Sequence, residues 1–365
     1  MATVCWILSA SWRKMMPRSE NGFFEEVFSL IHASADAGSE REGGKPFLLV
    51  THERPDGDAV GSLSALWILL NGNGYRADAL FPEEAPDFYR SFLCPVLKEP
   101  LSAEEINERY SLLINADAST VARLGLGGVD FTDLKLPLLT LDHHPDNGRF
   151  AQVNHVDPSA CSTAEVVYFL ARAADWRISP AAATALLLGI TTDSGCFRFD
   201  NTTAESMRAA ASLLDLGADH HAIIEKVYLS KPVNMAVFEA EMLSRHLRSA
   251  LDGKLVWLLL DPALMKRYSI DMRNTEQLIE LLRGMEGVEV AALLKPCGGK
   301  DGKMEMYKIS LRSKNPEISV GRIARRLGGG GHEMAAGCSI SAENAEEAES
   351  ILIQNVEMEF HETQS

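Results

Sequence analysis

The stretch PFLLVTHERPDGDAVGS, residues 46–62, carries most of the information about the fold. Its beginning predicts a buried strand over residues 46–52, because a continuous apolar run there ends in polar residues. Polar residues follow, and a helix is expected from Ala59 to Asn71, with its large apolar side chains on one face. A buried strand that leads through a polar turn into a helix is the unit from which parallel α/β sheets are built.

The same alternation continues along the chain. Short apolar runs recur at YRADALF (75–81), YSLLINAD (110–117) and LPLLTLDHH (136–144), with helical or loop segments between them. Ser162 and Glu165 have the spacing of a capping box, which predicts that a helix starts there. We therefore expect an α/β fold whose N-terminal domain, preceded by a helix over residues 21–37, contains a mostly parallel sheet.

The pattern changes in the second half. The region before residue 250 has helical, amphipathic spacing, and KLVWLLLD (254–261) then begins a new series of strands. A helix near 275–283, further strands at VEVAALLK and EMYKISLRS, a glycine run and a terminal helix follow. We expect three parts: an N-terminal catalytic domain (1–225), a helical linker (226–250) and a smaller α/β domain (251–365), with a cleft between the two domains.

Composition excludes several classes of protein. The chain has 365 residues, a net charge of −16 and 46% hydrophobic residues, as expected for a globular protein. A protein that grips long nucleic acid usually has a basic face, so a duplex binder is not expected. The six cysteines form no CxxC pair, which favours reduced thiols and a cytoplasmic location. The longest apolar run, 181–190, is too short to span a membrane, and the first 16 residues do not resemble a signal peptide.

Acidic and histidine side chains cluster where the predicted N-terminal strands end, and in parallel sheets ligands bind at the carboxyl ends of strands. Packed together, such carboxylates repel one another unless cations neutralise them. A mixed oxygen and imidazole set suits Mn²⁺, Zn²⁺ or Fe²⁺ better than Ca²⁺, and two such ions could share one carboxylate. The four expected strand ends contribute, in turn, His52, Asp56 and Asp58; Asp117; Asp142, His143 and His144; and Asp193.

These motifs resemble those of a known family. THERPDGDAVGS, the Asp-His-His triplet at 142–144, TTDSG (191–195) and GGGGHEMAAG (328–337) are similar, in order and spacing, to the successive motifs of DHH phosphoesterases and their associated C-terminal domain. The resemblance covers roughly residues 45–340. With this length and no oligonucleotide-binding addition, the chain most resembles the stand-alone nanoRNase and 3′-phosphoadenosine 5′-phosphate (pAp) phosphatase type.

The resemblance implies roles for particular residues. His52 and Asp56 resemble the ligands of one divalent metal ion, and Asp58, His143 and Asp193 those of a second, with Mn²⁺ as the expected metal. Asp117 resembles the bridge between the two ions. Two further catalytic roles are implied within the triplet: Asp142 orients a neighbouring imidazole, and His144 points to the reacting phosphate.

The glycine run is expected to bind substrate. Gly329, Gly330 and Gly331 let the backbone approach an anion, and His332 and Arg312 lie close to it in sequence or on the preceding strand. Arg312 could hold a terminal phosphate with two hydrogen bonds. The arginines at 322, 325 and 326 are interpreted instead as part of a solvated helix face.

The expected activity is two-metal hydrolysis of phosphate esters in very short nucleotides. Oligoribonucleotides of two to five nucleotides or pAp would be the substrates, and the cleft would act as a ruler that admits short ones. A phosphodiesterase for cyclic di-AMP or for the linear dinucleotides pApA and pGpG is the enzymatic alternative. A nucleotide-sensing module and a binder of long single strands are the non-enzymatic alternatives. No membrane partner is expected, and a homodimer is left open.

Overall fold

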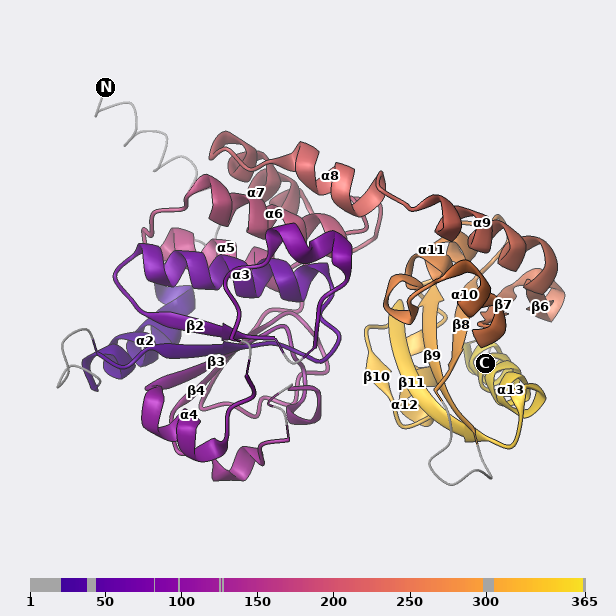
Figure 1. Ribbon diagram of the computed structural model, residues 1–365, viewed down its shortest axis with the longest axis horizontal. Coiled ribbons are helices and arrows are strands. Elements are labelled where there is room, and N and C mark those ends of the chain that lie inside the picture. The colour runs from indigo at the N-terminus through magenta and orange to yellow at the C-terminus, as the bar shows by residue number, and fades with distance from the viewer. Residues whose placement is uncertain are drawn as a thin grey trace. The chain divides into compact units, whose positions relative to one another are not determined.

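The computed structural model describes residues 21–37, 44–81, 83–97, 99–124, 126, 128–297 and 305–363. The expectations for the first 16 residues and for Cys5 lie outside this described part of the chain. The chain divides into two compact units, Met1–Ser230 and Lys231–Ser365. Figure 1 shows a helix-covered sheet in each. No helix within the described ranges is long and apolar enough to cross a membrane.

The N-terminal unit contains the predicted parallel sheet. Its five strands lie in the order β2-β1-β3-β4-β5, and every neighbouring pair is parallel. The fold class expected from the alternating pattern is therefore confirmed, with β5 as a strand that the pattern did not predict. The strands are β1 (Phe47–Val50), β2 (Ala77–Leu80), β3 (Leu112–Ala116), β4 (Leu138–Asp142) and β5 (Val153–Val156).

Helices cover both faces of this sheet. Alternate strand residues point to opposite sides, so that Leu49 and Ile114 join one core while Leu48 and Leu113 join the other. The first core is covered by α2 (Glu25–Ala37), α3 (Gly57–Gly72), α5 (Thr163–Ala173), α6 (Pro180–Asp193), α7 (Ala204–Asp215) and α8 (His220–Tyr228), and the second by α4 (Ala103–Arg109). Short 3₁₀ turns lie at Asn21–Phe24, Asp87–Phe92, Val121–Arg123 and Phe131–Asp133.

Helix α5 begins where the capping residues predict. The Ser162 hydroxyl accepts a hydrogen bond from the amide of Glu165 at 3.1 Å, which caps the helix. The Glu165 carboxylate accepts from the amide of Cys161, at 2.6 Å, and so supports the residue before the cap.

One element was predicted wrongly. The segment before Asp193 was expected to be a strand, but Pro180–Asp193 forms helix α6, so Asp193 ends a helix. Ser179 caps this helix and Pro180 occupies its first turn. The apolar run 181–190 lacks helical periodicity because α6 packs against α3, α5, α7 and α8 and is buried nearly all round. Such a run cannot be distinguished from a buried strand by its pattern alone.

Three glycines allow α3 and α6 to pack closely. A Cβ at Gly61 would lie 2.5 Å from the carbonyl oxygen of Ala185, and one at Gly189 would lie 2.6 Å from Oδ1 of Asp58. A Cβ at Gly57 would lie 2.3 Å from Oγ1 of Thr192. Real Cβ atoms do not approach other atoms so closely, so the two helices can adopt this packing only with glycine at these positions.

The C-terminal unit contains a mixed six-stranded sheet in the order β10-β11-β9-β8-β7-β6. Only β7 and β8 are parallel neighbours among the described strands, and the other pairs are antiparallel. The strands are β6 (Arg248–Ala250), β7 (Leu255–Leu259), β8 (Val290–Pro296), β9 (Glu305–Ser313), β10 (Gly330–Gly331) and β11 (Ala335–Ala342).

Helices also cover both faces of the second sheet. Helices α12 (Val320–Arg326) and α13 (Ala345–Thr363) pack on one face, and α9 (Val233–Glu241), α10 (Pro262–Tyr268) and α11 (Gln277–Arg283) on the other. The 3₁₀ turns Leu251–Gly253 and Met272–Asn274 and a π-helical turn at Met242–His246 complete the unit.

The segment expected as a helical linker, 226–250, differs from that expectation. Its middle is helix α9, whose Met235 and Phe238 are buried, with Met242, in the core of the C-terminal unit. Its last residues, Arg248–Ala250, form strand β6 and pair with β7. The apolar face of α9 is buried within a domain because it has a partner sheet there.

Candidate metal centre

Four segments of the N-terminal unit bring acidic and histidine side chains together. Asp117 follows β3, the triplet 142–144 lies at the end of β4, and Asp193 ends α6. The remaining segment is the turn from β1 into α3. Ligand atoms within 4.8 Å of one another occur in three groups here: His52, Asp56 and Asp117; Asp58, Asp117 and His143; and Asp117, Asp142 and His144.

Asp117 belongs to all three groups and links the first two through different oxygens. Its Oδ2 lies 3.5 Å from Nε2 of His52, whereas its Oδ1 lies 3.9 Å from Nε2 of His143. Nε2 of His52 also faces Oδ1 of Asp56 at 3.9 Å. Each oxygen of this carboxylate thus faces a different set of ligand atoms. Asp117 has a left-handed backbone with φ of 65°, a conformation that aspartate and asparagine tolerate better than most residues.

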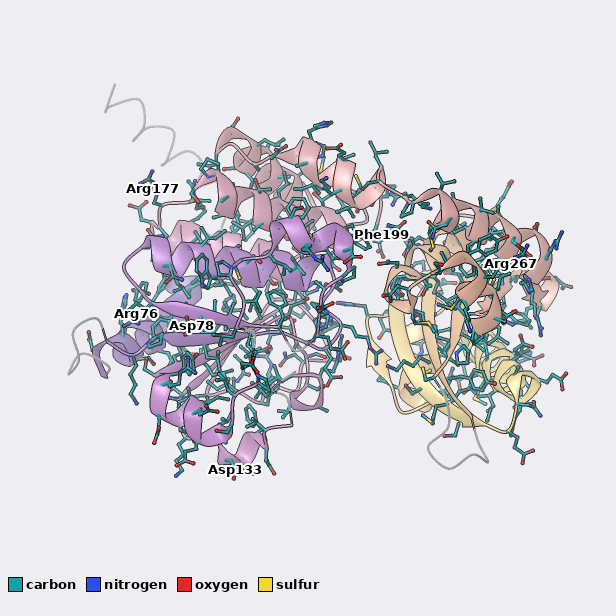
Figure 2. All side chains as sticks on the ribbon, in the orientation of Figure 1. Arg76, Asp78, Asp133, Arg177, Phe199 and Arg267 are labelled. Atoms are coloured by element: carbon teal, nitrogen blue, oxygen red, sulfur yellow. The ribbon has the colours of Figure 1, made fainter. Side chains whose placement is uncertain are left out.

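The second set is completed from two other elements. Nε2 of His143 lies 3.9 Å from Oδ2 of Asp58 and 3.5 Å from Oδ2 of Asp193. The main chain after Asp193 turns sharply: Gly195 has φ of 57°, and a Cβ there would lie 2.2 Å from the ring of Phe199, labelled in Figure 2. The glycine of TTDSG is therefore required by this turn.

Backbone carbonyls orient the two imidazoles. Nδ1 of His52 lies 2.7 Å from the carbonyl oxygen of Glu53, and Nδ1 of His143 lies 3.3 Å from that of Ala160. A hydrogen bond at Nδ1 fixes the tautomer and makes Nε2 the nitrogen that can bind a metal. In both residues Nε2 is also the atom that faces the carboxylates.

Backbone amides at the starts of α3 and α5 bind the carboxylates of Asp56 and Asp58. Oδ1 of Asp56 accepts from the amides of Asp58 and Ala59 and so caps α3. Asp58 is buried, and its two oxygens accept from the amides of Thr163 (2.6 Å) and Ala164 (2.9 Å) at the start of α5. These bonds fix the Asp58 carboxylate before any ligand arrives.

Burial and mutual repulsion shift the pKa values of the carboxylates in this cluster. Burial, with the charges of Asp117 and Asp193, raises the pKa of Asp58 well above its usual range. Burial also raises the pKa of Asp193 to about 6, although His143 opposes the rise. Asp117 is buried too, but the nearby histidines outweigh that effect and hold its pKa below its usual range. Buried carboxylates that repel one another, facing imidazole nitrogens, form a donor set that fits divalent transition-metal ions.

His144 has a different environment from His143. Its Nδ1 lies 2.7 Å from Oδ1 of Asp142, the buried aspartate at the end of β4. Burial lowers the pKa of His144, but the Asp142 charge and hydrogen bond outweigh burial and raise it to about 9. Asn147 donates to the other Asp142 oxygen, Oδ2, at 2.6 Å. Asp142 thus orients the imidazole of His144 within the triplet.

Three residues near the centre were missed by sequence reasoning. Thr163 donates from Oγ1 to Oδ1 of Asp117 at 2.9 Å, and Asn201 donates to the carbonyl oxygen of Asp193 at 3.1 Å. Arg123 lies beside the first motif, because its carbonyl oxygen accepts from the amide of Glu53 at 2.9 Å. Its charge also opposes the raised pKa of both His52 and His144. A helix-cap position could have suggested Thr163, but nothing local identifies Arg123.

The candidate substrate residues occupy one part of the C-terminal sheet. Arg312 on β9 pairs with Ala335 on β11, so it lies one strand away from the segment that follows His332. Its Nε donates to Oε1 of Glu280 at 3.0 Å, and its side chain is 25% exposed. Arg312 is therefore held by an acidic neighbour within its own unit, a contact that the sequence pattern did not suggest.

The glycine run also allows the chain to pair closely with β11. Gly330 and Gly331 form the edge strand β10, paired with Gly337 and Ala336 of β11. A Cβ at Gly329 would lie 2.1 Å from the carbonyl oxygen of Gly337. The glycines thus allow close approach to the backbone of β11, as well as to any ligand at this edge.

The arginines of α12 are more than a solvated face. Arg322 and Arg326 both pair with Glu359 of α13, a carboxylate with no solvent exposure, and Arg325 pairs with Glu333 at 2.8 Å. Arg322 and Arg326 hold α12 against α13, since a buried carboxylate needs such partners. Arg325 instead links α12 to the segment between β10 and β11.

Comparison with known proteins identifies the class. Residues 46–190 match the DHH family, N-terminal domain, and residues 258–358 match the DHHA1 domain. The chain therefore belongs to the DHH family of phosphoesterases, as its motifs predicted.

Particular relatives match over most of the chain. The bifunctional oligoribonuclease and PAP phosphatase NrnA of Thermus thermophilus is 30% identical over 321 residues, which cover 86% of this chain and 90% of the relative. The protein of the same name from Bacillus subtilis is 27% identical, over 80% of this chain and 88% of its own. The crystal structure of an exopolyphosphatase-related protein from Bacteroides fragilis has the same fold, with a TM-score of 0.74, 23% identity and coverage of 92% of this chain and 98% of its own.

Proposed function

We propose that this protein is a two-metal hydrolase of phosphate esters in very short nucleotides, acting as a nanoRNase on two to five nucleotides, as a pAp phosphatase, or as both. The observation that carries the proposal is the shared carboxylate of Asp117, whose two oxygens face two sets of ligand atoms. The names of the relatives from Thermus thermophilus and Bacillus subtilis supply the substrate class.

These distances support two proposed ligand sets. His52, Asp56 and Asp117 would hold one divalent ion, and Asp58, Asp117, His143 and Asp193 a second. Mn²⁺ is the proposed metal because it accepts mixed carboxylate and imidazole ligands. Such a pair supplies a hydroxide at neutral pH and neutralises phosphoryl charge.

The remaining residues position the reacting phosphate. Asp142 engages Nδ1 of His144, so Nε2 is the nitrogen that would donate to a phosphoryl oxygen. Arg123 places a second cation beside the first motif, at Glu53, and would contact the phosphate from the side of His52. Neither residue is proposed to bind metal.

The C-terminal unit would recognise the nucleotide. Arg312 is proposed to hold a phosphate group, exchanging part of its contact with Glu280 for the ligand, and a guanidinium has enough donors for both. The edge formed by Gly329, Gly330, Gly331 and His332 is proposed to bind the nucleotide close to the backbone. Remote contacts of this kind improve the position of the scissile bond and so raise kcat as well as affinity.

A cytoplasmic location is proposed with this activity. No disulfide joins the cysteines of the described residues, as expected in a reducing compartment. Whether two chains associate does not enter the proposed chemistry.

Substrate preference is the direct test. Hydrolysis with Mn²⁺ would be compared for pAp, pApA, a five-nucleotide RNA, cyclic di-AMP and pyrophosphate, with Asp117→Asn protein as the inactive control. We expect pAp or the short RNAs to be hydrolysed fastest. Preference for cyclic di-AMP would instead establish the alternative phosphodiesterase. Binding without hydrolysis of any substrate would point to a sensor, and activity that survives in the Asp117→Asn control would refute the proposed centre.

A further inference from the structure

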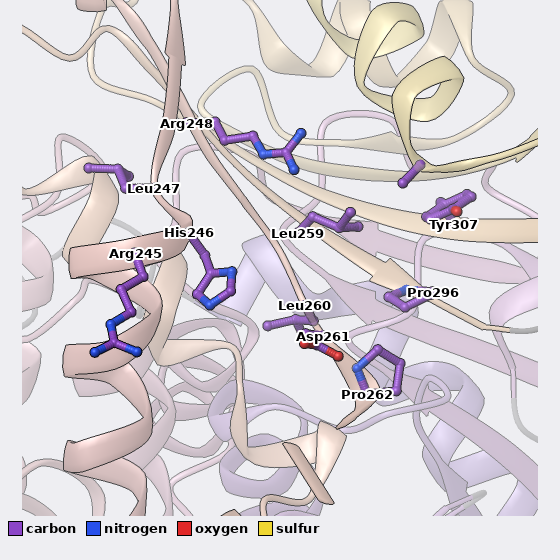
Figure 3. A pocket seen from close by; sticks show the side chains of 11 residues that line it. Arg245, His246, Leu247, Arg248, Leu259, Leu260, Asp261, Pro262, Pro296 and Tyr307 are labelled. Carbon is purple, nitrogen blue, oxygen red and sulfur yellow. The ribbon is translucent and has the colours of Figure 1, made fainter. Parts of the chain in front are cut away.

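A pocket separate from the candidate metal centre lies wholly within the C-terminal unit. It has a volume of about 590 Å³ and opens between the π-helical turn, β6 and the ends of β7 and β8 (Figure 3). Pro296, the last residue of β8, lines it, whereas Arg312 lies level with Ala291 near the start of that strand. Five residues of strand correspond to roughly 16 Å, so the pocket is separate from the candidate nucleotide-binding edge.

One wall of this pocket is basic. Arg245, His246 and Arg248 follow one another along this wall, although the whole chain has a net charge of −16. Figure 3 shows His246 and Arg248 on the side of the pocket formed by the turn and β6. Asp261, the single acidic residue in the described lining, accepts a hydrogen bond from the amide of Ala263 at 2.8 Å and caps α10. Within the described lining, the basic side chains therefore outnumber the acidic one.

Arg245 and Arg248 are each paired with a glutamate that does not line the pocket. Arg248 pairs with Glu349 of α13, and Arg245 lies 3.6 Å from Glu241. A guanidinium has five donors in a planar fork, so each of these pairs leaves donors for a second anion. Anchored guanidinium groups lose less side-chain entropy when a ligand binds than free ones do.

An unusual backbone forms this wall. Met242–His246 is a π-helical turn that directly continues α9, and the chain leaves it into β6. Single π turns within helices are rare and occur often at functional sites. The turn inserts an extra residue into the helical repeat and so changes the direction of Arg245 and His246 relative to α9. Met242, at its start, is fully buried and fixes this arrangement in the core.

The opposite wall is apolar. Leu259, Leu260, Pro262 and Pro296 line it, and Figure 3 shows them across the pocket from His246. Pockets of 300–1,000 Å³ with apolar walls and a few polar groups are typical of small-molecule sites. A ligand that satisfies both walls has an anionic end and a flat or apolar body.

We propose that this pocket binds a phosphomonoester with an aromatic or apolar body, of the type of a nucleoside 5′-monophosphate, at a site separate from the metal centre. The phosphate contacts Arg245, His246 and Arg248, and the body packs on Leu259, Pro262 and Pro296. The inference rests on the pocket alone and is independent of the proposed hydrolysis.

Equilibrium dialysis with AMP on the full-length, EDTA-treated protein tests this site, because the pocket contains none of the proposed metal ligands. We expect one AMP per chain to bind without metal, and inorganic phosphate or adenosine alone to bind more weakly. No metal-independent binding of AMP would overturn the proposal. Phosphate that binds as tightly as AMP would also overturn it, since the apolar wall would then contribute nothing.

Two variants locate the binding. Ala345→Trp places a large ring in the pocket from the start of α13 and removes no ion pair, so AMP binding should be lost while hydrolysis is unchanged. Arg245→Gln should weaken AMP binding by about fivefold, less than for a buried charged hydrogen bond because Arg245 is exposed. Arg267→Gln is the matched control: Arg267 also pairs with Glu241, at 3.7 Å, but does not line the pocket. Equal losses in the two glutamine variants, or normal binding in both pocket variants, would refute the site.

Discussion

Replacing Asp117 by asparagine should remove both proposed metal sites with little change in the fold. Asparagine keeps the shape of the side chain and tolerates the left-handed backbone at this position, where φ is 65°. Alanine would be a poorer choice, because the left-handed region costs an ordinary residue about 1–2 kcal/mol. The variant therefore tests the charge that both sets of ligand atoms share.

The magnitude follows from linkage. An ion present at 100 times its Kd stabilises the folded chain by about 2.7 kcal/mol, so two independent ions contribute about 5 kcal/mol. We expect the Mn²⁺-dependent increase in unfolding free energy to fall from about 5 kcal/mol to near zero in Asp117→Asn protein. The increase is measured within each variant, so changes in metal-free stability cancel.

Asp56→Asn is the matched control. Asp56 belongs to only one set of ligand atoms, its side chain is 59% exposed, and asparagine preserves its role as the cap of α3. This variant should keep one ion and about half of the stabilisation. Urea unfolding with and without Mn²⁺, together with elemental analysis of bound manganese, provides the measurement. Equal losses in the two variants, or two bound ions in Asp117→Asn protein, would refute the shared-carboxylate arrangement.

Four further predictions concern the reacting phosphate, the nucleotide-binding edge and the stability of the fold. His144→Ala should retain its metal but lose about 10²–10³-fold in kcat, the effect of one lost transition-state hydrogen bond; loss of metal would assign it as a ligand instead. Arg123→Ala should also lower kcat at unchanged metal content, with partial recovery in Arg123→Lys, and failure of lysine to restore any rate would argue against a purely electrostatic role. Arg312→Ala should raise KM and lower kcat for pAp or a dinucleotide but not for a small chromogenic phosphodiester. Arg283→Ala, which removes the other cation beside Glu280, should leave both substrates unaffected; equal losses on both substrates in Arg312→Ala would mean that it supports the fold. Burial lowers the pKa of His155 to about 4, so the unfolded chain binds a proton at this ring more tightly than the folded chain does. The stability that the neutral ring contributes is therefore complete above pH 6.5. Up to about 3 kcal/mol of it is lost as the pH falls towards 4. His155→Phe protein should lack this component of the acid destabilisation, and an unchanged pH profile would contradict it.

The sequence by itself determined the class of fold and the residue types of the candidate metal centre. Short apolar runs that end in polar residues are local features, and β1, β3 and β4 formed where those runs lie. The residue types near the strand ends allow few other uses, since so many carboxylates and histidines require cations when buried. The motif order then placed the chain in its family.

Tertiary structure decided the arrangement of individual atoms. Asp193 reaches the centre from a helix, because a run buried on all sides has no periodicity that separates helix from strand. The contact of Arg312 with Glu280 joins residues 32 positions apart, and the site beside Arg123 depends on a backbone bond to Glu53. Such contacts depend on how distant segments pack, and local pattern carries no information about packing partners.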